Sequence, residues 1–300
     1  MTSSPNAAPL LGLLLDVDGP IASPLTRSIS IPSIARDLAA LANAGNPVVF
    51  NTGRSDAFIA EQVVPPLVAA GLEPGAPVWA ICEKGAVWAE IDVNGLGEVH
   101  VDDALAMPAE FSDAMRAYVG EYFDEFGFFD ETKRAMVSVE QHVHVASADY
   151  LEAQPRFDEH ARETLAALGY GTVREGAERP DAAGRVHWRI DPTIISTDVE
   201  SVRLGKDLGA ARAVELLGAR GIRPQHWRTM GDSRGDYHMA DWLHARGEVQ
   251  RHVDVRAADG VPDTGYPVLT AGDLIHDHAG AVFLSRWVEA SRRGDLGDDE

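Results

Sequence analysis

Four short apolar runs, each followed at once by polar residues, constrain the fold of this chain most strongly. They cover residues 10–15, 47–50, 78–82 and 227–230, the last of which also contains Arg228 and Thr229. Continuous apolar runs of this length are typical of strands buried on both faces of a parallel sheet. Amphipathic helical patterns lie between and after them, at 33–44, 206–220, 236–246 and 273–292. Because strands alternate with helices, the sequence predicts a doubly wound α/β sheet.

The middle of the chain has a different pattern. Residues 86–101 are typical of a hairpin around 94–97, and 135–145 and 185–191 alternate as half-exposed strands. Helical patterns cover 108–125 and 150–168. Half-exposed strands with helices indicate an antiparallel sheet covered on one face. We therefore predict a Rossmann-like core formed by 1–82 and 196–300, interrupted by an α+β insert at 83–195.

Charge and composition exclude several classes of protein. The chain has 26 basic and 47 acidic residues, a formal net charge of −21. Such an acidic chain is a poor candidate for binding nucleic acid or an anionic membrane, because both partners are negatively charged. Cys82 is the only cysteine, so no intrachain disulfide and no cysteine-based zinc site is possible. The first apolar run is far shorter than the roughly 20 residues of a membrane span. We expect no signal peptide, no transmembrane helix and a cytoplasmic protein.

Polar side chains follow three of the predicted strands, and the carboxyl ends of strands are where open α/β sheets bind ligands. Asp16 and Asp18 follow the first run, and Thr52 and Gly53 follow the second. Asp232 and Asp236 follow the fourth run, and Lys206 begins a predicted helix. Taken singly, each group also fits an ordinary structural role without chemistry. Asp-x-Asp-Gly is common in turns, Thr caps helices, and a lone Lys is usually solvated.

Together, these groups fit phosphoryl transfer through an aspartyl-phosphate. One carboxylate attacks phosphorus, while Mg²⁺ screens the charges and clamps the oxygens. A second carboxyl group protonates the leaving oxygen and later activates water. Lys and Thr side chains, with the backbone N–H groups of the loop, neutralise and orient the transferred group.

These motifs, in this order and spacing, resemble those of the haloacid dehalogenase-like (HAD) hydrolase superfamily. The four motifs are DVDG at 16–19, Thr52 within NTGRS, Lys206, and GDSRGD at 231–236. The insert, which opens with CEKGA at 82–86, resembles the large α+β cap of the Cof-type and sucrose-phosphatase-like branch. The resemblance implies that Asp16 is the nucleophile and Asp18 the general acid/base. It further implies that Thr52, Gly53 and Lys206 bind phosphate, and that Mg²⁺ is held by Asp16, the backbone carbonyl of Asp18, Asp232 and, in support, Asp236.

Two residues depart from the family pattern. Pro20 stands where Thr is common after Asp-x-Asp-Gly, and it has neither a hydroxyl nor an N–H to donate. Lys84 stands in the usual Glu-Asn-Gly-Ala segment, in place of Asn. Two interpretations of Lys84 stay open: a cation near the cleft, or an exposed residue of a hinge.

The expected function is a Mg²⁺-dependent phosphatase acting on a small phosphorylated metabolite, a sugar phosphate, with the cap setting specificity. On the predicted strand at 185–191, Arg185, His187 and Arg189 share one face, which suits an anionic substrate or an ordinary solvated surface. A phosphosugar mutase and a non-catalytic sugar-phosphate-binding protein are the alternatives. The sequence does not indicate the oligomeric state.

Overall fold

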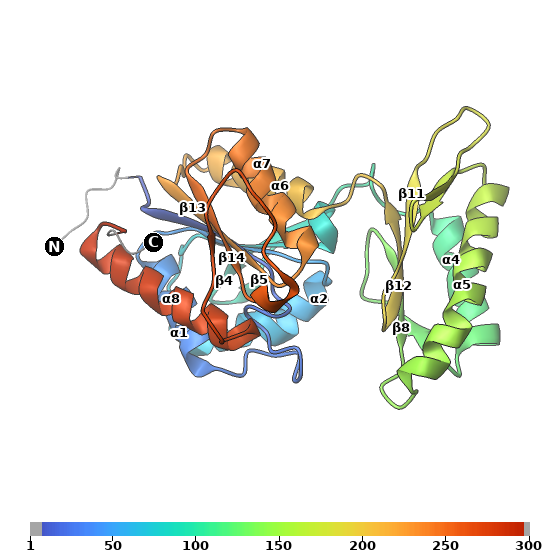
Figure 1. Cartoon of the computed structure of the whole chain (residues 1–300), viewed down its shortest axis with the longest axis horizontal. Helices are drawn as coiled ribbons and strands as arrows, with labels where there is room; N and C mark the ends of the chain where they lie inside the picture. The colour runs from blue at the N-terminus through green and yellow to red at the C-terminus, as the bar shows by residue number, and fades with distance from the viewer. Residues whose placement is uncertain (1–7, 297–300) are drawn as a thin grey trace. The chain divides into compact units, whose positions relative to one another are not determined.

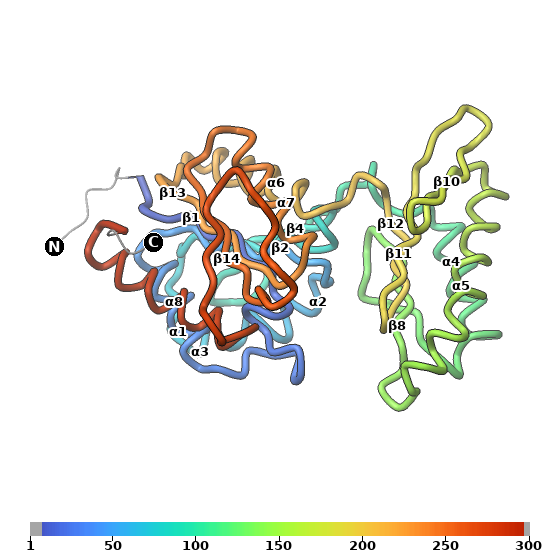
Figure 2. Tube along the Cα trace, in the orientation of Figure 1, coloured from blue at the N-terminus to red at the C-terminus, as the bar shows by residue number. Residues whose placement is uncertain are grey.

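The computed structural model describes residues 8–296 and divides the chain into two compact units. The first unit combines the chain up to His100 with the chain from Gly205 onward, and the second is Val101–Leu204. In Figure 2 the first unit contains the blue to cyan and the orange to red parts of the trace. The insert was expected at 83–195. Residues 87–96 instead remain with the first sheet through a hairpin, and residues 196–201 pair within the second sheet.

The first unit is built on one sheet with the strand order β15-β14-β13-β1-β2-β3-β4-β5. Neighbouring strands are parallel from β15 to β3, and β4 and β5 continue the sheet in antiparallel pairs. The strands are β1 (Leu11–Leu15), β2 (Val48–Asn51), β3 (Val78–Cys82), β4 (Val87–Asp92), β5 (Gly95–Leu96), β13 (His226–Gly231), β14 (Gln250–Asp254) and β15 (Val268–Leu269). Strand β6 (His100–Val101) lies at the boundary of the two units.

Helices cover both faces of this sheet, which confirms the predicted doubly wound α/β core. Helices α1 and α8 lie side by side on one face, and α6 and α7 lie on the other (Figure 1). The helices are α1 (Pro32–Asn43), α2 (Asp56–Phe58), α3 (Val64–Ala69), α6 (Lys206–Ala219), α7 (Tyr237–Ala245) and α8 (His276–Arg293), with helical turns η1 (Ile59–Val63), η2 (Glu83–Gly85), η4 (Arg234–Asp236) and η5 (Ala257–Asp259). All five residues of β1 are buried, as the continuous apolar run predicts. No helix among residues 8–296 is long and apolar enough to cross a membrane.

The second unit is a six-stranded sheet with helices on one face (Figure 1). Its strand order is β10-β9-β11-β12-β8-β7, and every pair except β11 with β9 is antiparallel. The elements are α4 (Ala109–Tyr118), η3 (Val119–Phe123), β7 (Gly127–Phe129), β8 (Val137–Gln141), α5 (Ser147–Ala167), β9 (Thr172–Arg174), β10 (Ala177–Arg179), β11 (Trp188–Pro192) and β12 (Ser196–Ser201). Phe111, Phe123 and Phe157 from the helical segments pack on strand residues of the same core.

Two strand predictions differ from the structure in their details. Strand β4 pairs with Gly95–Leu96 directly after Asp92, and β6 (His100–Val101), which lies within the predicted 98–101, also pairs with β4. Strand β11 begins at Trp188, so Arg185 and His187 lie in the preceding loop. Asp181 organises that loop by accepting hydrogen bonds from the backbone N–H groups of Ala183 and Arg185, at 2.8 Å each.

Gly280 of α8 is expected to tolerate no side chain. A methyl group at this position would lie 2.0 Å from the carbonyl oxygen of Pro20, in the loop after β1. Gly280→Ala should therefore destabilise the protein by roughly 1–3 kcal/mol, the usual cost of overpacking. Gly218→Ala is the matched control, since Gly218 is exposed near the end of α6 and has open space around it. It should stabilise the protein by about 0.5–1 kcal/mol. Urea denaturation measures both, and a gain in stability for Gly280→Ala would contradict the close packing of α8 on this loop.

Candidate active site

Asp16 and Asp232 come together because β1 and β13 are parallel neighbours. Leu15 pairs with Met230, and the Asp16 backbone N–H donates to the Met230 carbonyl at 2.8 Å. Each strand therefore delivers the carboxylate that follows it to the same edge of the sheet. Gly19 permits the approach: its φ is +91°, and a Cβ there would lie 2.7 Å from Asp232 Oδ2. The glycine of the DVDG motif is thus required both by its backbone angle and by the space that Asp232 occupies.

Lys206, at the start of α6, joins the carboxylates into one cluster. Its Nζ lies 2.6 Å from Asp16 Oδ1, 2.8 Å from Asp236 Oδ1 and 2.7 Å from the Asn51 carbonyl oxygen. The ammonium group donates hydrogen bonds to Asp16 and to the Asn51 carbonyl, and it forms an ion pair with Asp236. The interpretation of Lys206 as a solvated surface residue is wrong, because only 14% of its side chain is exposed.

Asn51 and Gly209 set the position of Lys206. The Asn51 side-chain amide donates to the Lys206 carbonyl at 2.9 Å, at the first turn of α6. A Cβ at Gly209, one turn further along α6, would lie 1.9 Å from Asn51 Oδ1. Glycine at this position therefore lets the helix approach the end of β2 closely enough for Lys206 to reach two carboxylates.

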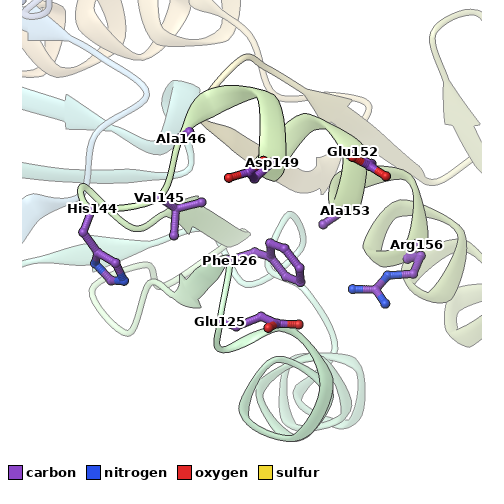
Figure 3. Close-up of a pocket in the computed structure, with 9 residues that line it drawn as sticks. All are labelled: Glu125, Phe126, His144, Val145, Ala146, Asp149, Glu152, Ala153 and Arg156. Atoms are coloured by element: carbon purple, nitrogen blue, oxygen red, sulfur yellow. The ribbon is translucent and has the colours of Figure 1, made fainter.

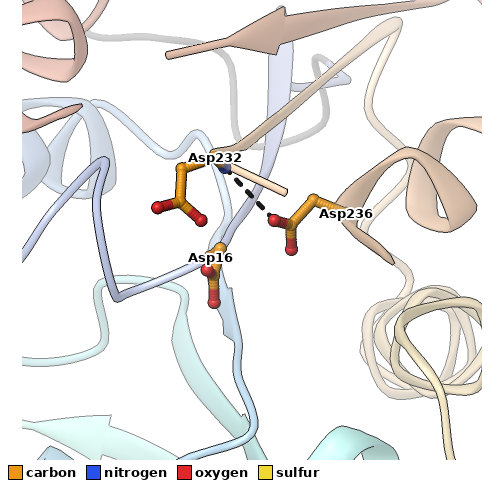
Figure 4. Close-up of side chains that lie close together, drawn as sticks. All are labelled: Asp16, Asp232 and Asp236. Atoms are coloured by element: carbon orange, nitrogen blue, oxygen red, sulfur yellow. Dashed lines mark hydrogen bonds between the residues drawn. The ribbon is translucent and has the colours of Figure 1, made fainter. Parts of the chain in front are cut away.

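The three carboxylates of Asp16, Asp232 and Asp236 gather at one point (Figure 4). Each offers an oxygen atom within 4.8 Å of the others. Asp236 uses both of its oxygens in protein contacts. Oδ1 faces Lys206, and Oδ2 accepts from the backbone N–H of Asp232 at 3.2 Å and from the backbone N–H and the hydroxyl of Ser233 at 3.0 and 2.7 Å. Asp236 is therefore held rigidly against the loop that carries Asp232.

Burial and charge act in opposite directions on this cluster. Burial, aided by Asp236 and Asp18, raises the pKa of Asp16 well above its ordinary value although Lys206 opposes the shift. Burial and the Asp236 charge also raise the pKa of Asp232. Burial alone would raise the pKa of Asp236, but Lys206 and the hydrogen bonds from Ser233 hold it below its ordinary value. Burial likewise opposes the charge on Lys206, yet Asp16 and Asp236 raise its pKa. The site therefore holds more negative charge than its lysine neutralises.

The Asp18 side chain lies outside this cluster and accepts two hydrogen bonds from the Arg54 guanidinium, a pairing that we call the fork. Arg54 Nε lies 2.9 Å from Asp18 Oδ2, and Arg54 Nη2 lies 3.0 Å from Oδ1. The Asp18 side chain is 39% exposed. The fork fixes the plane of the carboxylate, and its exposure leaves it accessible to a reacting group.

Thr52 and Gly53 form the loop after β2, directly after Asn51, whose carbonyl oxygen accepts a hydrogen bond from Lys206. Thr52 is fully buried, and its Oγ1 accepts from the backbone N–H of Arg54 at 3.1 Å. The hydroxyl thus caps a turn. Ser55 caps α2 through Phe58, so a short helix begins directly after this loop. Gly53 is half-buried.

The three cationic residues predicted in the second unit each lie beside a carboxylate. Arg185 Nη2 and His187 Nε2 lie 2.9 and 3.8 Å from Asp181 Oδ2. Arg189 Nε donates to the buried Glu200 carboxylate at 3.0 Å. The structure therefore brings Arg185 and His187 together around Asp181, and it places Arg189 with Glu200.

The second unit also contains a pocket of about 680 Å³, between the turn after η3 and the start of α5 (Figure 3). Asp149 and Glu152 from α5 and Glu125 from the turn give it an acidic lining, with Arg156 over the Phe126 ring. None of the residues predicted to do chemistry lines this pocket. The carboxylate cluster of the first unit is therefore the candidate active site.

Sequence reasoning missed three residues that shape the site. Arg54 lies inside the NTGRS motif, so its position was visible although its pairing with Asp18 was not. Asn51 ends β2, and its contact with Lys206 depends on the approach of a distant helix. His276 opens α8 with a φ of +51°, and its Nδ1 lies 3.6 Å from Asp232 Oδ2. No local pattern relates His276 to residue 232.

The fold of the chain matches solved structures, while no protein-family model and no curated protein matches its sequence. The C-terminal domain of a trehalose-6-phosphate phosphatase from C. albicans superposes with a TM-score of 0.61 at 13% identity, covering 94% of this chain and 93% of that one. A haloacid dehalogenase-like hydrolase from Bacteroides thetaiotaomicron gives 0.57 at 10% identity, covering 92% and 98%. Trehalose-6-phosphate phosphatase from Aspergillus fumigatus gives 0.53 at 16% identity, covering 94% of both chains. This likeness confirms that the chain has the haloacid dehalogenase-like fold, as its motifs indicated.

Proposed function

We propose that this chain is a Mg²⁺-dependent phosphatase that hydrolyses a small phosphorylated metabolite through an aspartyl-phosphate intermediate. The observation that carries the proposal is the convergence of Asp16, Asp232 and Asp236 on one point around Lys206, at the carboxyl ends of parallel strands. The fold is shared with proteins described as phosphatases, and it supports the same class of reaction.

The residues present fit a magnesium ion. The candidate side-chain ligands are carboxylate oxygens, the donors that Mg²⁺ prefers, and three of them lie within 4.8 Å of one another. Because both oxygens of Asp236 are used in protein contacts, Asp16 and Asp232 would be the direct side-chain ligands, with the backbone carbonyl of Asp18. Asp236 would position the Asp232 loop and Lys206. When bound, the ion would neutralise charge on the transferring phosphoryl group.

In the proposed reaction, two carboxylates act in turn. A carboxylate oxygen of Asp16 attacks phosphorus, and the bond between phosphorus and the leaving oxygen breaks. Asp18 donates a proton to that oxygen, which requires the substrate to replace one Arg54 donor on the Asp18 carboxylate. Asp18 then accepts a proton from the water that attacks the aspartyl-phosphate, and inorganic phosphate and free Asp16 result. Lys206, Thr52 and the backbone of Gly53 would hold the phosphate oxygens.

The substrate class we propose is a sugar phosphate, selected by the second unit. Two of the structural neighbours are described as trehalose-6-phosphate phosphatases, which supports a phosphorylated sugar. The selective role of Arg185, His187 and Arg189 stays a prediction. A substrate that used them would have to compete with Asp181 or Glu200, which already pair with them.

A panel of phosphorylated metabolites tests this proposal. Purified protein with Mg²⁺ should release inorganic phosphate from one or more sugar phosphates, including trehalose 6-phosphate. Chelation with EDTA should stop the release, and added Mg²⁺ should restore it. Isomer formation without phosphate release would instead establish a phosphosugar mutase. Tight binding without turnover of any ester, including p-nitrophenyl phosphate, would establish a sugar-phosphate-binding protein.

A further inference from the structure

The Asp232 carboxylate differs from the other three carboxylates of the site in its basic partner. Each of the other three contacts Lys206 or Arg54, which belong to the sequence motifs. Among residues 8–296, the basic side chain within ion-pair distance of Asp232 is His276, whose Nδ1 lies 3.6 Å from Asp232 Oδ2. The carboxylate that ends the fourth predicted strand therefore faces a residue from outside every motif.

The Nδ1 atom of His276 is buried and has no hydrogen-bond partner. Its distance of 3.6 Å from Asp232 Oδ2 is longer than a hydrogen bond. Buried polar atoms in native proteins are nearly always paired, because an unpaired one costs free energy. An approach of about 0.5 Å would bring the two atoms to the distance of an N–H···O hydrogen bond. Asp232 Oδ2 is thus the partner toward which this nitrogen is directed.

Two backbone hydrogen bonds through Val255 hold His276 against the loop that carries Asp232. The Val255 N–H donates to the Gly231 carbonyl at 3.0 Å, and the His276 N–H donates to the Val255 carbonyl at 2.8 Å. Gly231 immediately precedes Asp232. One residue, just after β14, therefore links the backbone before Asp232 to the backbone of His276.

The first turn of α8 is also anchored to the loop after β1. The Ser30 hydroxyl donates to the buried Asp277 carboxylate at 3.0 Å, and Gly280 packs against the carbonyl of Pro20. His276 has a φ of +51°, in the left-handed region that few residues other than glycine adopt. Such a conformation persists only where the surroundings impose it, and it clusters at binding and catalytic sites. The fold therefore fixes the imidazole beside the site.

We propose that His276 is a positioning residue for the Mg²⁺ site, whose Nδ1 donates a hydrogen bond to Asp232 Oδ2 and orients that carboxylate toward the ion. This inference rests on the proposed function and adds to it a residue that no motif contains.

The proposed hydrogen bond would act on the metal through Asp232 alone. A carboxylate that binds a metal through one oxygen is oriented when its other oxygen accepts a hydrogen bond, and losing such a partner typically lowers metal affinity about 10–100-fold. Lys206 already contacts two other carboxylates, at 2.6 and 2.8 Å. The role requires only a proton on Nδ1, which the protonated ring and one neutral tautomer of His276 both have.

Two substitutions separate the hydrogen-bond donor from the ring. His276→Asn keeps an N–H donor at the same number of bonds from the backbone and tolerates the left-handed region. His276→Phe keeps a ring and removes the donor. Calorimetric titration of the full chain with Mg²⁺, without substrate, measures the affinity directly. His276→Asn should bind Mg²⁺ within about threefold of wild type, whereas His276→Phe should bind at least about tenfold more weakly.

A third variant separates this role from a purely structural one. His276→Gly removes the ring and relieves the strained φ. Its urea midpoint in EDTA should not fall below that of wild type, while its Mg²⁺ affinity should fall as in His276→Phe. A structural role would instead lower stability in EDTA and leave the affinity unchanged. Glu175→Gly is the matched control, since Glu175 has a φ of +48° and is exposed in the second unit. It should bind Mg²⁺ as wild type does.

The outcomes distinguish this inference from the phosphatase function. Wild-type Mg²⁺ affinity in both His276→Phe and His276→Gly would overturn the role of His276, as would an equal loss of affinity in His276→Asn. If wild-type protein binds Mg²⁺ but releases phosphate from no ester, the phosphatase function fails, and the affinities of the variants still decide the role of His276. Absence of Mg²⁺ binding to wild-type protein would overturn both.

Discussion

Replacing Asp16 with Asn is expected to abolish phosphate release while leaving the fold intact. The amide cannot attack phosphorus, so no aspartyl-phosphate forms. The rate should fall by a factor of about 10³ or more, the scale of losing a nucleophile. Phosphate release from p-nitrophenyl phosphate measures the effect. Asp207→Asn is the matched control, since Asp207 is the exposed residue that follows Lys206, and it should retain wild-type activity. A variant Asp16→Asn that keeps more than a few per cent of wild-type activity would remove Asp16 from this role.

The stability of Asp16→Asn should depend less on pH than the stability of the wild-type protein. Burial raises the pKa of Asp16 in the folded protein, so the folded state binds more protons than the unfolded state above pH 4. Stability of the wild-type protein should therefore fall as pH rises through this window when Mg²⁺ is removed. Asn carries no ionisable proton, so Asp16→Asn should lose less stability over the same range. Thermal unfolding in EDTA between pH 5 and 8 measures the difference, and parallel curves would show that Asp16 is not the buried acid we describe.

Strands β1 and β3 could be predicted because their sequences are apolar throughout, while β14 could not. Strand β14 reads QRHVD, yet His252 within it is fully buried beside β13. Its Nδ1 lies 2.8 Å from Thr229 Oγ1, and burial lowers the pKa of His252 to about 4, which keeps the ring neutral. Asp254 at the end of the strand accepts from the Tyr237 hydroxyl at 2.7 Å. Partners supplied by distant segments make this polar strand compatible with the core, and hydrophobic pattern alone does not reveal them.

The residues of the candidate site also differ in whether the local sequence could predict them. The positions of Asp16, Asp232 and Lys206 could be predicted because each lies at the end of a strand or the start of a helix whose pattern is strong. Residues 185–191 were predicted as one strand because Arg, His and Arg alternate with apolar residues, but residues 185–187 lie in the loop before β11. The carboxylate of Asp181 instead binds the backbone and side chain of Arg185. Pairings such as Arg54 with Asp18, and the approach of His276 to Asp232, depend on tertiary structure and leave no local signal.

Lys206→Met is expected to cost both activity and stability. Removing the ammonium group leaves Asp16 and Asp236 buried without the cation that both contact at 2.6 and 2.8 Å. Breaking a buried ion pair by deleting one partner typically costs about 3–5 kcal/mol. Methionine has nearly the same length, so the loss should reflect charge more than packing. Lys133→Met in the second unit is the matched control and should change stability little.

The dependence of the stability loss on pH and on Mg²⁺ distinguishes a loss of charge from a loss of packing in Lys206→Met. Without Lys206, the two carboxylates repel each other and their folded-state pKa values rise, so the folded state gains protons relative to the unfolded state. The stability deficit of Lys206→Met should be largest at pH 8 in EDTA and should shrink as pH falls toward 5. Added Mg²⁺ should recover part of it at pH 8, because a divalent cation can take over the neutralisation of Asp16. Urea denaturation at both pH values measures the deficit. A deficit that is equal at pH 5 and pH 8 and unaffected by Mg²⁺ would mean that Lys206 stabilises the fold by packing and not by neutralising this cluster.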